Sequence, residues 1–502
     1  MSEKLRVGIL GGTGMVGQRF ISLLENHPWF EVVTIAASPR SAGKTYEEAV
    51  GGRWKMTTPM PEAVKNIVVM NVNEVEKVAA TVDFVFSAVD MSKDEIKAIE
   101  EEYAKTETPV VSNNSAHRWT PDVPMVVPEV NPEHFDVIEF QKKRLGTTRG
   151  FIAVKPNCSI QSYAPALTAW KEFEPYEVVA TTYQAISGAG KTFKEWPEMI
   201  ENIIPYIGGE EEKSEQEPLR IWGHIEDGVI VKAQEPKITC QCIRVPVLNG
   251  HTAAVFVKFR KKPTKEQLIE KLVNFKGFPQ EAELPSAPKQ FIQYMEEDNR
   301  PQVQLDVNFE NGMGVSIGRI REDSIYDFKF VGLSHNTVRG AAGGAVLCAE
   351  TLKAKGYITK KKISGKEYYY LQYTSFGKKK SEYLQESSVE FVREKLILGE
   401  KLRKEIAENN TKLSRLERAV KILDEQLSRS FFHLRQCADM DALPISKRYK
   451  ALSFARAMTS LEGLPAKEST EENLQLWAKG EKSFADFYLP ALQDYRVMEV
   501  SR

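Results

Sequence analysis

A glycine-rich turn near the N-terminus constrains the fold of this chain more than any other feature. Residues 6–10 are mostly apolar and predict a short buried strand. Gly11, Gly14 and Gly17 follow at three-residue spacing and lead into a helical pattern. In this context glycines let the backbone approach a dinucleotide pyrophosphate, and the helix N-terminus offers it free N–H groups. The segment therefore predicts a dinucleotide site in a Rossmann-type domain.

The segments that follow alternate between strand-like and helical patterns. Strand-like runs lie at 32–37, 66–70, 84–89 and 110–111, and a helical stretch lies at 93–106. Strands that alternate with helices favour a doubly wound parallel sheet, so we expect the α/β class.

The pattern changes at about residue 151. Longer alternating strands lie at 177–186, 238–247 and 253–260. They predict a mixed or antiparallel sheet in a second, α+β domain. A helical segment rich in glycine and alanine, at 337–355, closes this part of the chain.

The end of the second predicted strand indicates which dinucleotide would bind. Ser38, Arg40, Ser41 and Lys44 follow Ala37 there, at the point where an NAD site normally has a carboxylate for the ribose. Hydroxyls and cations suit a 2′-phosphate instead, so the sequence predicts NADP rather than NAD. A polar surface loop without a ligand is the alternative.

Composition excludes several classes of protein. The 502 residues correspond to about two to four domains. The chain is 42% apolar and 27% charged, as expected of a globular protein, and its net charge of −1 predicts no general affinity for nucleic acid or anionic membranes. No apolar run approaches the roughly 18 residues of a membrane span, and the N-terminus has no signal-peptide pattern.

The cysteines favour a reducing compartment. They lie at positions 158, 240, 242, 348 and 437, too scattered for a disulfide framework. Cys240 and Cys242 are too close together for the usual zinc spacing, and no second Cys/His pair follows nearby. We therefore expect a cytoplasmic protein without a bound metal.

Cys158 is a candidate nucleophile. It follows an apolar strand at 151–154 and precedes a helical run that includes Leu167 and Trp170. A helix N-terminus favours thiolate over thiol, and the free amides of residues 157–159 would hold an oxyanion. A buried structural cysteine is the alternative.

Two pairs of polar residues downstream would assist such a thiol. Arg244 and His251 lie seven residues apart at the end of a predicted strand. His251 would exchange protons with the thiol, and Arg244 would clamp a carboxylate, although a histidine after a glycine is also common in turns. Glu210 and Lys213 lie one helical turn apart, either on a solvated face or at a site for an ammonium and an anion.

Residues 1–356 resemble the aspartate-β-semialdehyde dehydrogenase family, in its archaeal and fungal branch. The resemblance covers about 70% of the chain. The stretches that carry it are 8–17, 38–44, 111–118, 156–159, 183–190, 204–207, 242–251 and 334–343.

The resemblance implies a role for each matched residue. Cys158 would be the nucleophile, His251 the acid/base, and Gln184 the group that orients the reacting carbonyl. The substrate-binding residues would be Arg244 for the carboxylate, Glu210 for the amino group, and Arg118 with Lys213 for the phosphate. The residues expected at the NADP site are Gly11, Thr13, Gly14, Met15, Val16, Gly17, Ser38, Arg40, Ser41, Gly188, Asn336 and Gly343.

The implied reaction converts L-aspartyl-4-phosphate and NADPH to aspartate semialdehyde, phosphate and NADP through a Cys158 thioester. Members of the family act in lysine, threonine and methionine synthesis, and they are dimers or tetramers. The main alternative is a malonyl-CoA reductase of the same stock, which would have no amino group for Glu210 to bind. N-acetyl-glutamyl-phosphate reductase is a more distant alternative.

We expect an NADP-binding domain at 1–150 with 336–356, and a catalytic and dimerisation domain at 151–335. The remaining chain has a different texture. Residues 357–386 are rich in lysine and tyrosine and predict a small basic β-meander. A basic aromatic hairpin can bind nucleic acid, but a solvated sheet edged with lysines is the preferred interpretation.

Residues 387–430 carry a seven-residue apolar repeat, which predicts a long helix that either pairs in a coiled coil or packs on its own chain. In a coiled coil, Asn409 would fix the register. Residues 440–502 predict short helices, and 447–494 resemble the small antitoxins of Fic adenylyl-transferase toxins. That resemblance implies an inhibitory glutamate at Glu462 and a Fic-domain partner. Met458 stands where the family usually has Ser or Thr.

Overall fold

The chain divides into two compact units, Met1–Gly356 and Tyr357–Arg502. The computed structural model describes residues 4–355, three strands between 358 and 384 without their side chains, and 468–486. It also describes single helical residues at 392, 395, 409, 440, 441 and 448. Each unit is described by itself below.

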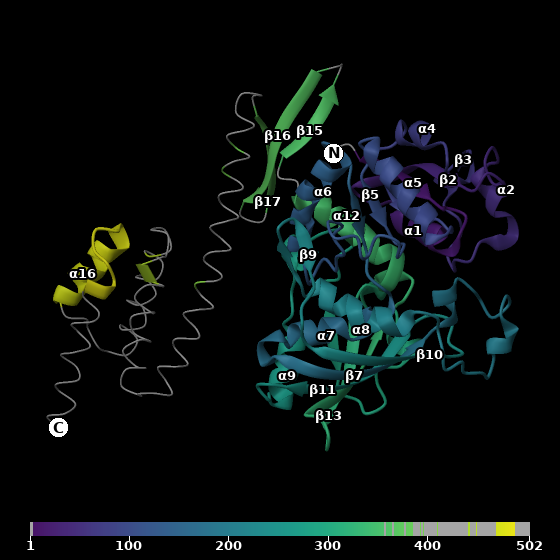
Figure 1. The fold of residues 1–502 in the computed structure, drawn as a ribbon. Coiled ribbons are helices and arrows are strands. Elements are labelled where there is room, and N and C mark those ends of the chain that lie inside the picture. Colours follow the sequence, from purple (N-terminus) through teal and green to yellow (C-terminus); the bar gives the residue numbers. More distant parts are fainter. Residues whose placement is uncertain are drawn as a thin grey trace. The chain divides into compact units, whose positions relative to one another are not determined.

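The first sheet of unit 1 is parallel throughout and has the strand order β3-β2-β1-β4-β5-β6. Its strands are β1 (Leu5–Leu10), β2 (Phe30–Ala37), β3 (Met70–Asn71), β4 (Phe84–Ser87), β5 (Val110–Ser112) and β6 (Ile152–Val154). The helices around it include α1 (Met15–Leu24), α5 (Lys93–Lys105) and α12 (Gly343–Lys355) (Figure 1). The predicted doubly wound α/β sheet is confirmed.

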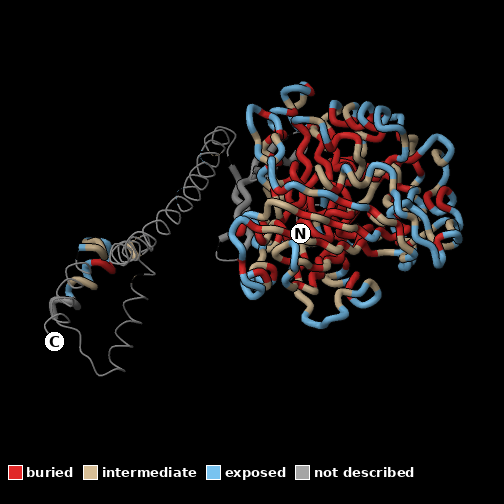
Figure 2. Tube along the Cα trace, turned by 60° about the horizontal axis from the view of Figure 1, so that its bottom comes forward, coloured by how far each residue is buried: buried red, intermediate tan, exposed pale blue. Residues whose placement is uncertain are grey.

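Burial of the strands explains why this sheet forms. Val7, Ile9 and Leu10 of β1 are fully buried, as expected for a strand covered on both faces. Figure 2 shows the buried residues of this unit gathered in its interior and the exposed residues around its periphery. The glycine turn leaves the carboxyl end of this central strand, where doubly wound sheets bind ligands.

Two elements of unit 1 differ from expectation. The strand predicted at 66–70 is only β3, and Val68 makes a single bridge to Thr45, because this segment lies at the sheet edge and pairs only with β2. The helix predicted at 337–355 opens with a wide π-helical turn, η8 (Val338–Ala342), before α12 begins. Gly340 of this turn approaches Cys158 so closely that a Cβ would lie 2.7 Å from the cysteine Cβ.

The second sheet of unit 1 is mixed, with the order β10-β7-β11-β14-β13-β12. Its strands are β7 (Pro175–Gln184), β10 (Lys237–Arg244), β11 (His251–Phe259), β12 (Ile292–Met295), β13 (Val315–Glu322) and β14 (Phe328–Ser334). Helices α7 (Ala164–Ala169) and α8 (Glu210–Ile221) lie along one face of it (Figure 1). The fully buried Trp170, just after α7, packs on Phe259 and Phe330 in the core.

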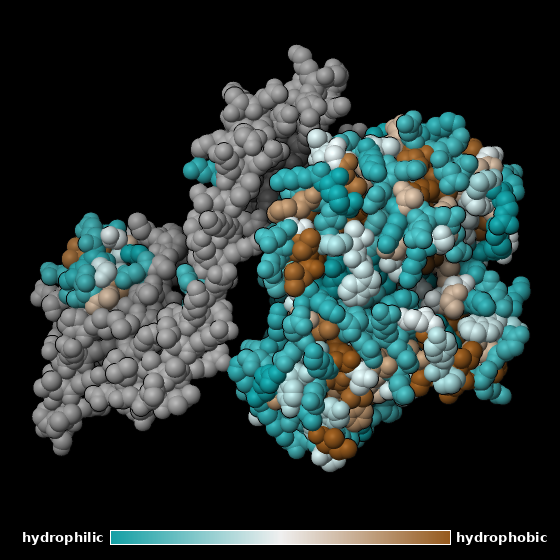
Figure 3. Space-filling view, viewed as in Figure 1, coloured by the Kyte–Doolittle hydropathy of each residue, from teal (hydrophilic) through white to brown (hydrophobic). Residues whose placement is uncertain are grey.

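The remaining elements of unit 1 are short, apart from α6 and α9. They are α2 (Tyr46–Val50), α3 (Glu62–Lys65), α4 (Val75–Ala79), α6 (Ile138–Leu145), β8 (His224–Glu226), β9 (Val229–Val231), α9 (Lys265–Val273), α10 (Phe278–Glu281) and α11 (Val303–Asp306). The face of unit 1 seen in Figure 3 is mainly hydrophilic, with scattered apolar residues. Among the described residues, no helix combines the length and the apolar character needed to cross a membrane.

In unit 2, β15 (Ile358–Ile363), β16 (Lys366–Ser375) and β17 (Lys378–Leu384) form an antiparallel meander, as predicted. Helix α16 (Glu468–Lys479) buries Trp477 against Phe484. The heptad repeat lies almost wholly outside the described residues. Asn409 is described, and it is helical and exposed. Glu462 and Met458 also lie outside the described residues.

Candidate active site

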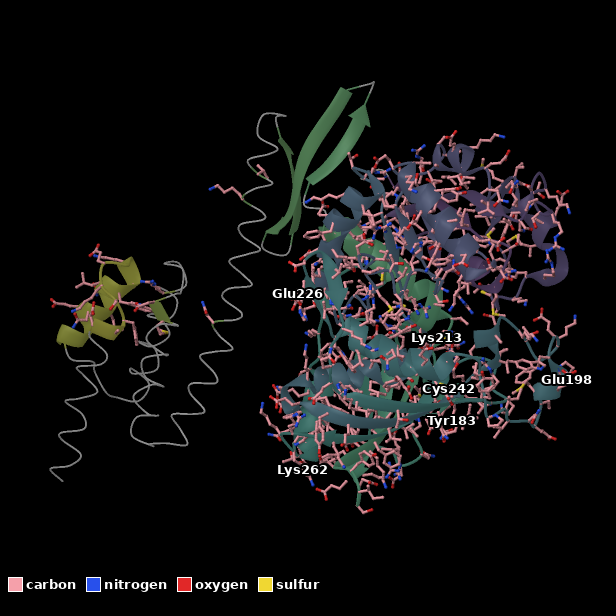
Figure 4. The ribbon with its side chains drawn as sticks, in the orientation of Figure 1. Tyr183, Glu198, Lys213, Glu226, Cys242 and Lys262 are labelled. Atoms are coloured by element: carbon pink, nitrogen blue, oxygen red, sulfur yellow. The ribbon has the colours of Figure 1, made fainter. Side chains whose placement is uncertain are left out.

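The ends of three neighbouring strands bring polar residues together. Strand β7 lies between β10 and β11 and ends at Gln184. Arg244 ends β10 directly opposite Gln184, because the two strands are parallel and in register. His251 begins β11, which runs antiparallel to β7, so it lies at the same edge. In Figure 4, Lys213, Cys242 and Tyr183 mark this region, whereas Glu198 and Lys262 lie at the periphery of the unit.

Cys158 lies against this edge of the sheet. The chain leaves β6, the last strand of the first sheet, and reaches Cys158 four residues after Val154. The Cys158 sulfur lies 3.3 Å from Nε2 of His251. Cys158 is half-buried, and His251 is fully buried. The predicted nucleophile and its predicted acid/base are therefore in direct contact, although they lie on different elements.

The backbone around Cys158 differs from the expected helix N-terminus. Cys158 precedes a four-residue 3₁₀ turn, η3 (Ser159–Ser162), and α7 begins only after a break at Tyr163. Helix charge effects are confined to the terminal turn of a regular helix. Because this segment is short and is interrupted before α7, its macrodipole is too small to stabilise a Cys158 thiolate much.

The charge state of the thiol also differs from expectation. Burial is the largest influence and raises the pKa of Cys158, and the Glu210 carboxylate raises it further. Lys155, Arg118 and Arg244 oppose this shift but do not reverse it. The predicted low-pKa thiol is therefore wrong for the site as folded, because desolvation of a thiolate outweighs its neighbouring cations.

Two of the three amides expected to hold an oxyanion are already used. The amide of Asn157 donates to Oε2 of Glu217 at 2.5 Å, and the amide of Ser159 donates to Oδ1 of Asn157 at 2.7 Å. The amide of Cys158 has no acceptor among the described residues. The prediction was therefore wrong for residues 157 and 159, whose amides hold the loop in shape.

His251 is held as a neutral imidazole. Burial, followed by the charge of Arg244, lowers its pKa to about 3. Its Nδ1 accepts a hydrogen bond from the amide of Ala185 at 3.0 Å. Because an amide N–H can only donate, Nδ1 carries the lone pair and the ring proton is on Nε2, which faces the Cys158 sulfur. The ring is therefore a hydrogen-bond donor toward the reacting atoms.

Glu210 is the centre of a polar cluster at the start of α8. Its Oε1 accepts from Nζ of Lys213 at 2.7 Å, and its Oε2 accepts from Asn157 Nδ2 at 2.8 Å and from Gln184 Nε2 at 3.4 Å. Burial alone would raise the pKa of Glu210, but Lys213 and the Asn157 amide outweigh it and the pKa is lowered. The structure thus brings Glu210, Lys213 and Gln184 together as an ion pair with a neighbouring amide.

The two predicted arginines of the site have different partners. Arg118 donates to Glu217 Oε1 at 3.0 Å, to the Lys155 carbonyl at 3.1 Å and to the Asn113 carbonyl at 3.4 Å. Arg244 donates to the Ala185 carbonyl at 2.6 Å and makes no ion pair with any described residue. Its guanidinium therefore has an uncompensated charge beside His251.

The glycine turn fits a dinucleotide. Gly11 has a φ of +82°, and a Cβ there would lie 2.2 Å from the Ala88 carbonyl oxygen; a Cβ on Gly17 would lie 2.3 Å from the Gly11 oxygen. A Cβ on Gly14 would meet only one atom, at 3.5 Å. No side chain caps α1, so its first amides are open to an anion. Thr13, Met15 and Val16 complete this turn.

The loop after β2 is a tight turn, in which the Ser41 amide donates to the Ser38 carbonyl at 2.9 Å. Ser38 and Arg40 are exposed, Ser41 is half-buried, and residues 38–44 contain no carboxylate. These features fit a 2′-phosphate better than a ribose diol.

The other residues expected around the cofactor lie at the second sheet. Asn336 is buried; its Oδ1 accepts from the Gly250 amide and its Nδ2 donates to Ser187 Oγ, both at 2.8 Å. A Cβ on Gly188 would lie 3.1 Å from both Arg244 Nη1 and His251 Cε1. Gly343 packs on Met313, where a Cβ would lie 2.6 Å from the sulfur, and its place beside the cofactor stays a prediction.

Sequence reasoning missed three residues of the site: Asn157, Glu217 and Lys155. Glu217 follows Glu210 by two helical turns, so the periodicity of α8 could have placed both on one face. Asn157 adjoins the cysteine and could have been suspected. The position of Lys155, which is fully buried, had no signal in the sequence.

Two family models cover most of unit 1. The model of the semialdehyde dehydrogenase NAD-binding domain matches residues 6–138, and the model of the semialdehyde dehydrogenase dimerisation domain matches 166–339. A model of a domain of unknown function matches residues 345–394. The first model covers most of the parallel sheet but not β6, and the second covers the mixed sheet.

Curated relatives match over the same region. The chain is 42% identical over 353 residues to the aspartate-semialdehyde dehydrogenase of Methanothermobacter thermautotrophicus, which covers 69% of this chain and 99% of the relative. It is 44% identical over 372 residues to the enzyme of that name from Saccharomyces cerevisiae, with 71% and 100% covered.

Two solved structures of aspartate semialdehyde dehydrogenases also match this chain. The structure of aspartate semialdehyde dehydrogenase with NADP from Candida albicans matches with a TM-score of 0.64 and 40% identity, over 70% of this chain and 99% of that one. Aspartate semialdehyde dehydrogenase II complexed with ASA from Vibrio cholerae matches with a TM-score of 0.54 and 26% identity, over 70% and 99%.

Proposed function

Because this chain belongs to the aspartate-semialdehyde dehydrogenase family, we propose that it reduces L-aspartyl-4-phosphate to L-aspartate 4-semialdehyde with NADPH. The observation that carries the proposal is the contact of 3.3 Å between the Cys158 sulfur and His251 Nε2, at a strand edge that also holds Gln184 and Arg244. Covalent thiol chemistry needs a nucleophile within reach of a proton donor, and this edge provides both.

In this mechanism the ionised Cys158 sulfur attacks the acyl carbonyl and phosphate leaves, which gives a thioester on the enzyme. The Nε2 proton of His251 faces this centre and donates to the oxygen that becomes negative. After reduction, the thiohemiacetal collapses, the Cys158 thiolate leaves and the aldehyde is released. Gln184, which borders the same space, orients the carbonyl.

The substrate groups match the charges at the edge. Arg244 has no carboxylate partner in the part of the chain that the structure describes, so it is suited to the substrate carboxylate. Glu210 is held ionised and is suited to the substrate ammonium. Arg118 and Lys213 are proposed for the phosphate; both already pair with carboxylates, Glu217 and Glu210, so these pairs would be shared with the substrate.

The cofactor proposed is NADP, held by Gly11, Gly14 and the uncapped start of α1, with Ser38, Arg40 and Ser41 at the 2′-phosphate. NADPH supplies the hydride when it is bound. Asn336, anchored to Gly250 and Ser187, is proposed to contact the nicotinamide, beside Gly188. The uncapped amides and the absence of a carboxylate in residues 38–44 support this choice.

The wider setting follows from the same proposal. We propose a cytoplasmic homodimer or homotetramer that acts in lysine, threonine, methionine and isoleucine synthesis. A malonyl-CoA reductase of the same stock is the competing activity; the ionised Glu210 supports the aspartyl substrate, because malonyl-CoA has no ammonium for it to bind.

The test is an assay of the purified full-length protein with aspartate semialdehyde, phosphate and NADP, beside malonyl-CoA with NADPH. We expect reduction of NADP that depends on phosphate and is lost in Cys158→Ala. His251→Asn should lower kcat about 100-fold while the Kd for NADP stays the same. NADP reduction by Cys158→Ala at the wild-type rate would show that the thioester route is wrong.

For residues 440–502 we propose an antitoxin-like module that binds a Fic-domain partner through Glu462. Its support, besides the sequence resemblance, is a small folded helical core: Trp477 of α16 is buried, its indole N–H donates to Asp441 Oδ1, and the Phe484 amide donates to the same oxygen.

The full-length protein is the reagent for testing this second function. It should reduce adenylylation by a Fic domain in vitro, and Glu462→Ala should abolish the inhibition. If Glu462→Ala inhibits as well as the wild type, or if neither inhibits, the module has another role.

A further inference from the structure

Lys155, three residues before Cys158, is buried without an ion-pair partner among the described residues. Lys155 follows β6 and is 2% exposed. Its Nζ donates to the Pro156 carbonyl, and no described carboxylate lies within ion-pair distance of it. Burial, followed by the charge of Arg118, lowers its pKa to about 7. Such a group is costly to the fold, because a buried ammonium without a carboxylate loses its hydration.

The Lys155 side chain packs against α12. A Cβ on Gly344 would lie 3.4 Å from Cε of Lys155. One helical turn earlier, Gly340 touches Cys158 in the same way. Arg118 holds the backbone of Lys155 by donating to its carbonyl. One continuous segment, η8 with α12, therefore contacts both the lysine stem and the cysteine.

Apart from Arg244, the other groups near the sulfur do not provide a free positive charge. His251 is neutral, and it offers a hydrogen bond but no charge. The charge of Arg118 is balanced by Glu217, and that of Lys213 by Glu210. Arg244 is uncompensated, but the proposed function assigns it to the substrate carboxylate, which would neutralise it at the moment of attack.

We infer that Lys155 is the buried counter-cation of the Cys158 thiolate, and that it allows this thiol to ionise in a site whose histidine is neutral. The inference rests on the proposed function, which needs the thiolate. In this step the S–H bond breaks. Where Lys155 is already an ammonium, the thiol proton leaves to solvent; where it is the neutral amine, as its pKa of about 7 allows, Nζ takes up a proton as the thiol loses one, so the product in both cases is a thiolate beside an ammonium. Lys155 acts through Cys158 and is a positioning residue.

The charged groups that face the pair agree with this inference. At the sulfur, Glu210 of α8 opposes ionisation, whereas Lys155, Arg118 and Arg244 favour it, in that order. At Lys155, Arg118 opposes the ammonium.

Three groups would favour the Lys155 ammonium when they are ionised: Cys158, Glu217 and Cys348. Cys348, on α12, has its own pKa raised by burial to about 12, so it adds no charge at neutral pH. The thiolate and the ammonium therefore stabilise each other.

The test measures the pKa of Cys158 directly. In the full-length protein without substrate, the rate of alkylation of Cys158 by iodoacetamide is followed against pH by mass spectrometry of its peptide. Lys155→Met should move the midpoint up by about one pH unit or more. Lys262→Met, at an exposed position on the periphery, should leave it unchanged. A midpoint in Lys155→Met equal to that of the wild type would overturn the inference.

A second pair of readouts separates charge from structure. Turnover of Lys155→Met should recover toward the wild-type value as the pH is raised, since alkali ionises the thiol without help; a structural defect would not recover. Lys155→Arg keeps a cation and should keep the midpoint near that of the wild type, so it also serves if the methionine variant does not fold. An upward shift in Lys155→Arg as large as in Lys155→Met would reject the role of charge.

Lys155→Met should make the folded protein more stable, although it hinders the ionisation of Cys158. The pKa of Lys155 in the folded chain, about 7, is below its ordinary value of 10.5, so the unfolded chain binds more protons between these values. Lys155 therefore lowers stability at neutral pH, and Lys155→Met should raise the Tm at pH 7. A lower Tm, with an unchanged alkylation midpoint, would make the lysine merely structural. The alkylation test uses no substrate. An unchanged midpoint would therefore overturn the role of Lys155 without affecting the proposed activity, and a failed activity assay would leave the alkylation result as it is.

Discussion

At Cys158, burial raises the pKa of a thiol, and 3.3 Å away at His251 burial lowers the pKa of an imidazole. Both groups are thereby pushed toward their neutral forms. Before substrate binds, the pair is therefore a neutral thiol and a neutral Nε2–H donor, rather than a preformed thiolate–imidazolium pair. The positive charge that stabilises a Cys158 thiolate therefore has to come from the cations around this pair, and the buried Lys155 is one of them.

The buried histidines predict acid sensitivity. Burial lowers the pKa of His117, His134, His251 and His335, the last to about 4. In the unfolded chain each returns to about 6.5 and binds a proton as the pH falls, so stability falls from about pH 6.5 downward. For His251 and His335 the loss between pH 7 and pH 5 is about 2 kcal/mol each. Thermal unfolding of the full-length protein should show a clearly lower Tm at pH 5 than at pH 7; an equal Tm would contradict these buried neutral histidines.

Helix α8 and the ends of strands β7, β10 and β11 together position the residues of the candidate site. Glu210 and Glu217 lie two turns apart on α8, and each fixes a different part of the Cys158 loop: Glu210 holds the Asn157 side chain and Glu217 holds the Asn157 amide. The helix therefore positions the nucleophile loop as well as the groups proposed for the substrate.

Changes on α8 should distinguish its two faces. Glu210→Gln removes the charge proposed for the substrate ammonium, so we expect the KM for aspartate semialdehyde to rise about 10- to 100-fold. The KM for NADP should not change. Glu212→Gln, on the exposed face of the same turn, is the matched control and should behave as the wild type. Equal effects of the two variants would remove Glu210 from the substrate site.

The turn after β2 permits a separate test. Arg40 is exposed and is proposed to face the 2′-phosphate of NADP. Arg40→Ala should raise the KM for NADP about tenfold, the loss expected from one charge-assisted hydrogen bond, and should leave the weaker use of NAD unchanged. Steady-state kinetics with both cofactors measure this. A parallel loss with NAD would show that Arg40 acts on the fold of the turn.

For the whole molecule, the division at Gly356 separates the site from the tail. Each residue proposed for the reductase lies in Met1–Gly356, and the curated relatives cover about this region. Unit 2 is a separate compact unit with its own meander and helix.

A stop codon after Gly356 should therefore leave the reductase active, with kcat and both KM values within about twofold of those of the full-length protein. Size-exclusion chromatography of both forms would show whether the oligomer changes with the tail. Loss of activity in the soluble fragment would mean that unit 2 contributes to the site.

Particular residues show how much of the fold and of the candidate site could be predicted from the sequence. The glycine turn, the strand–loop–helix order and the position of Cys158 are local patterns, so the parallel sheet and the nucleophile segment were predictable. The strand predicted at 66–70 was too long, because an edge strand is limited by its one neighbour, which no local pattern records. The lowered pKa expected for Cys158 at a helix N-terminus was wrong, because the thiol is desolvated by segments far away in the chain.

By itself the sequence determined that a glycine turn follows a buried strand and that a cysteine follows another, because backbone conformation and periodicity are properties of neighbours. Only the tertiary structure decided that β10 and β11 flank β7, which puts Arg244, Gln184 and His251 at one edge. Only it decided that Lys155 is buried with no described carboxylate at ion-pair distance. Charge states follow the solvent and charges that surround a group, and these are set by segments distant in the chain.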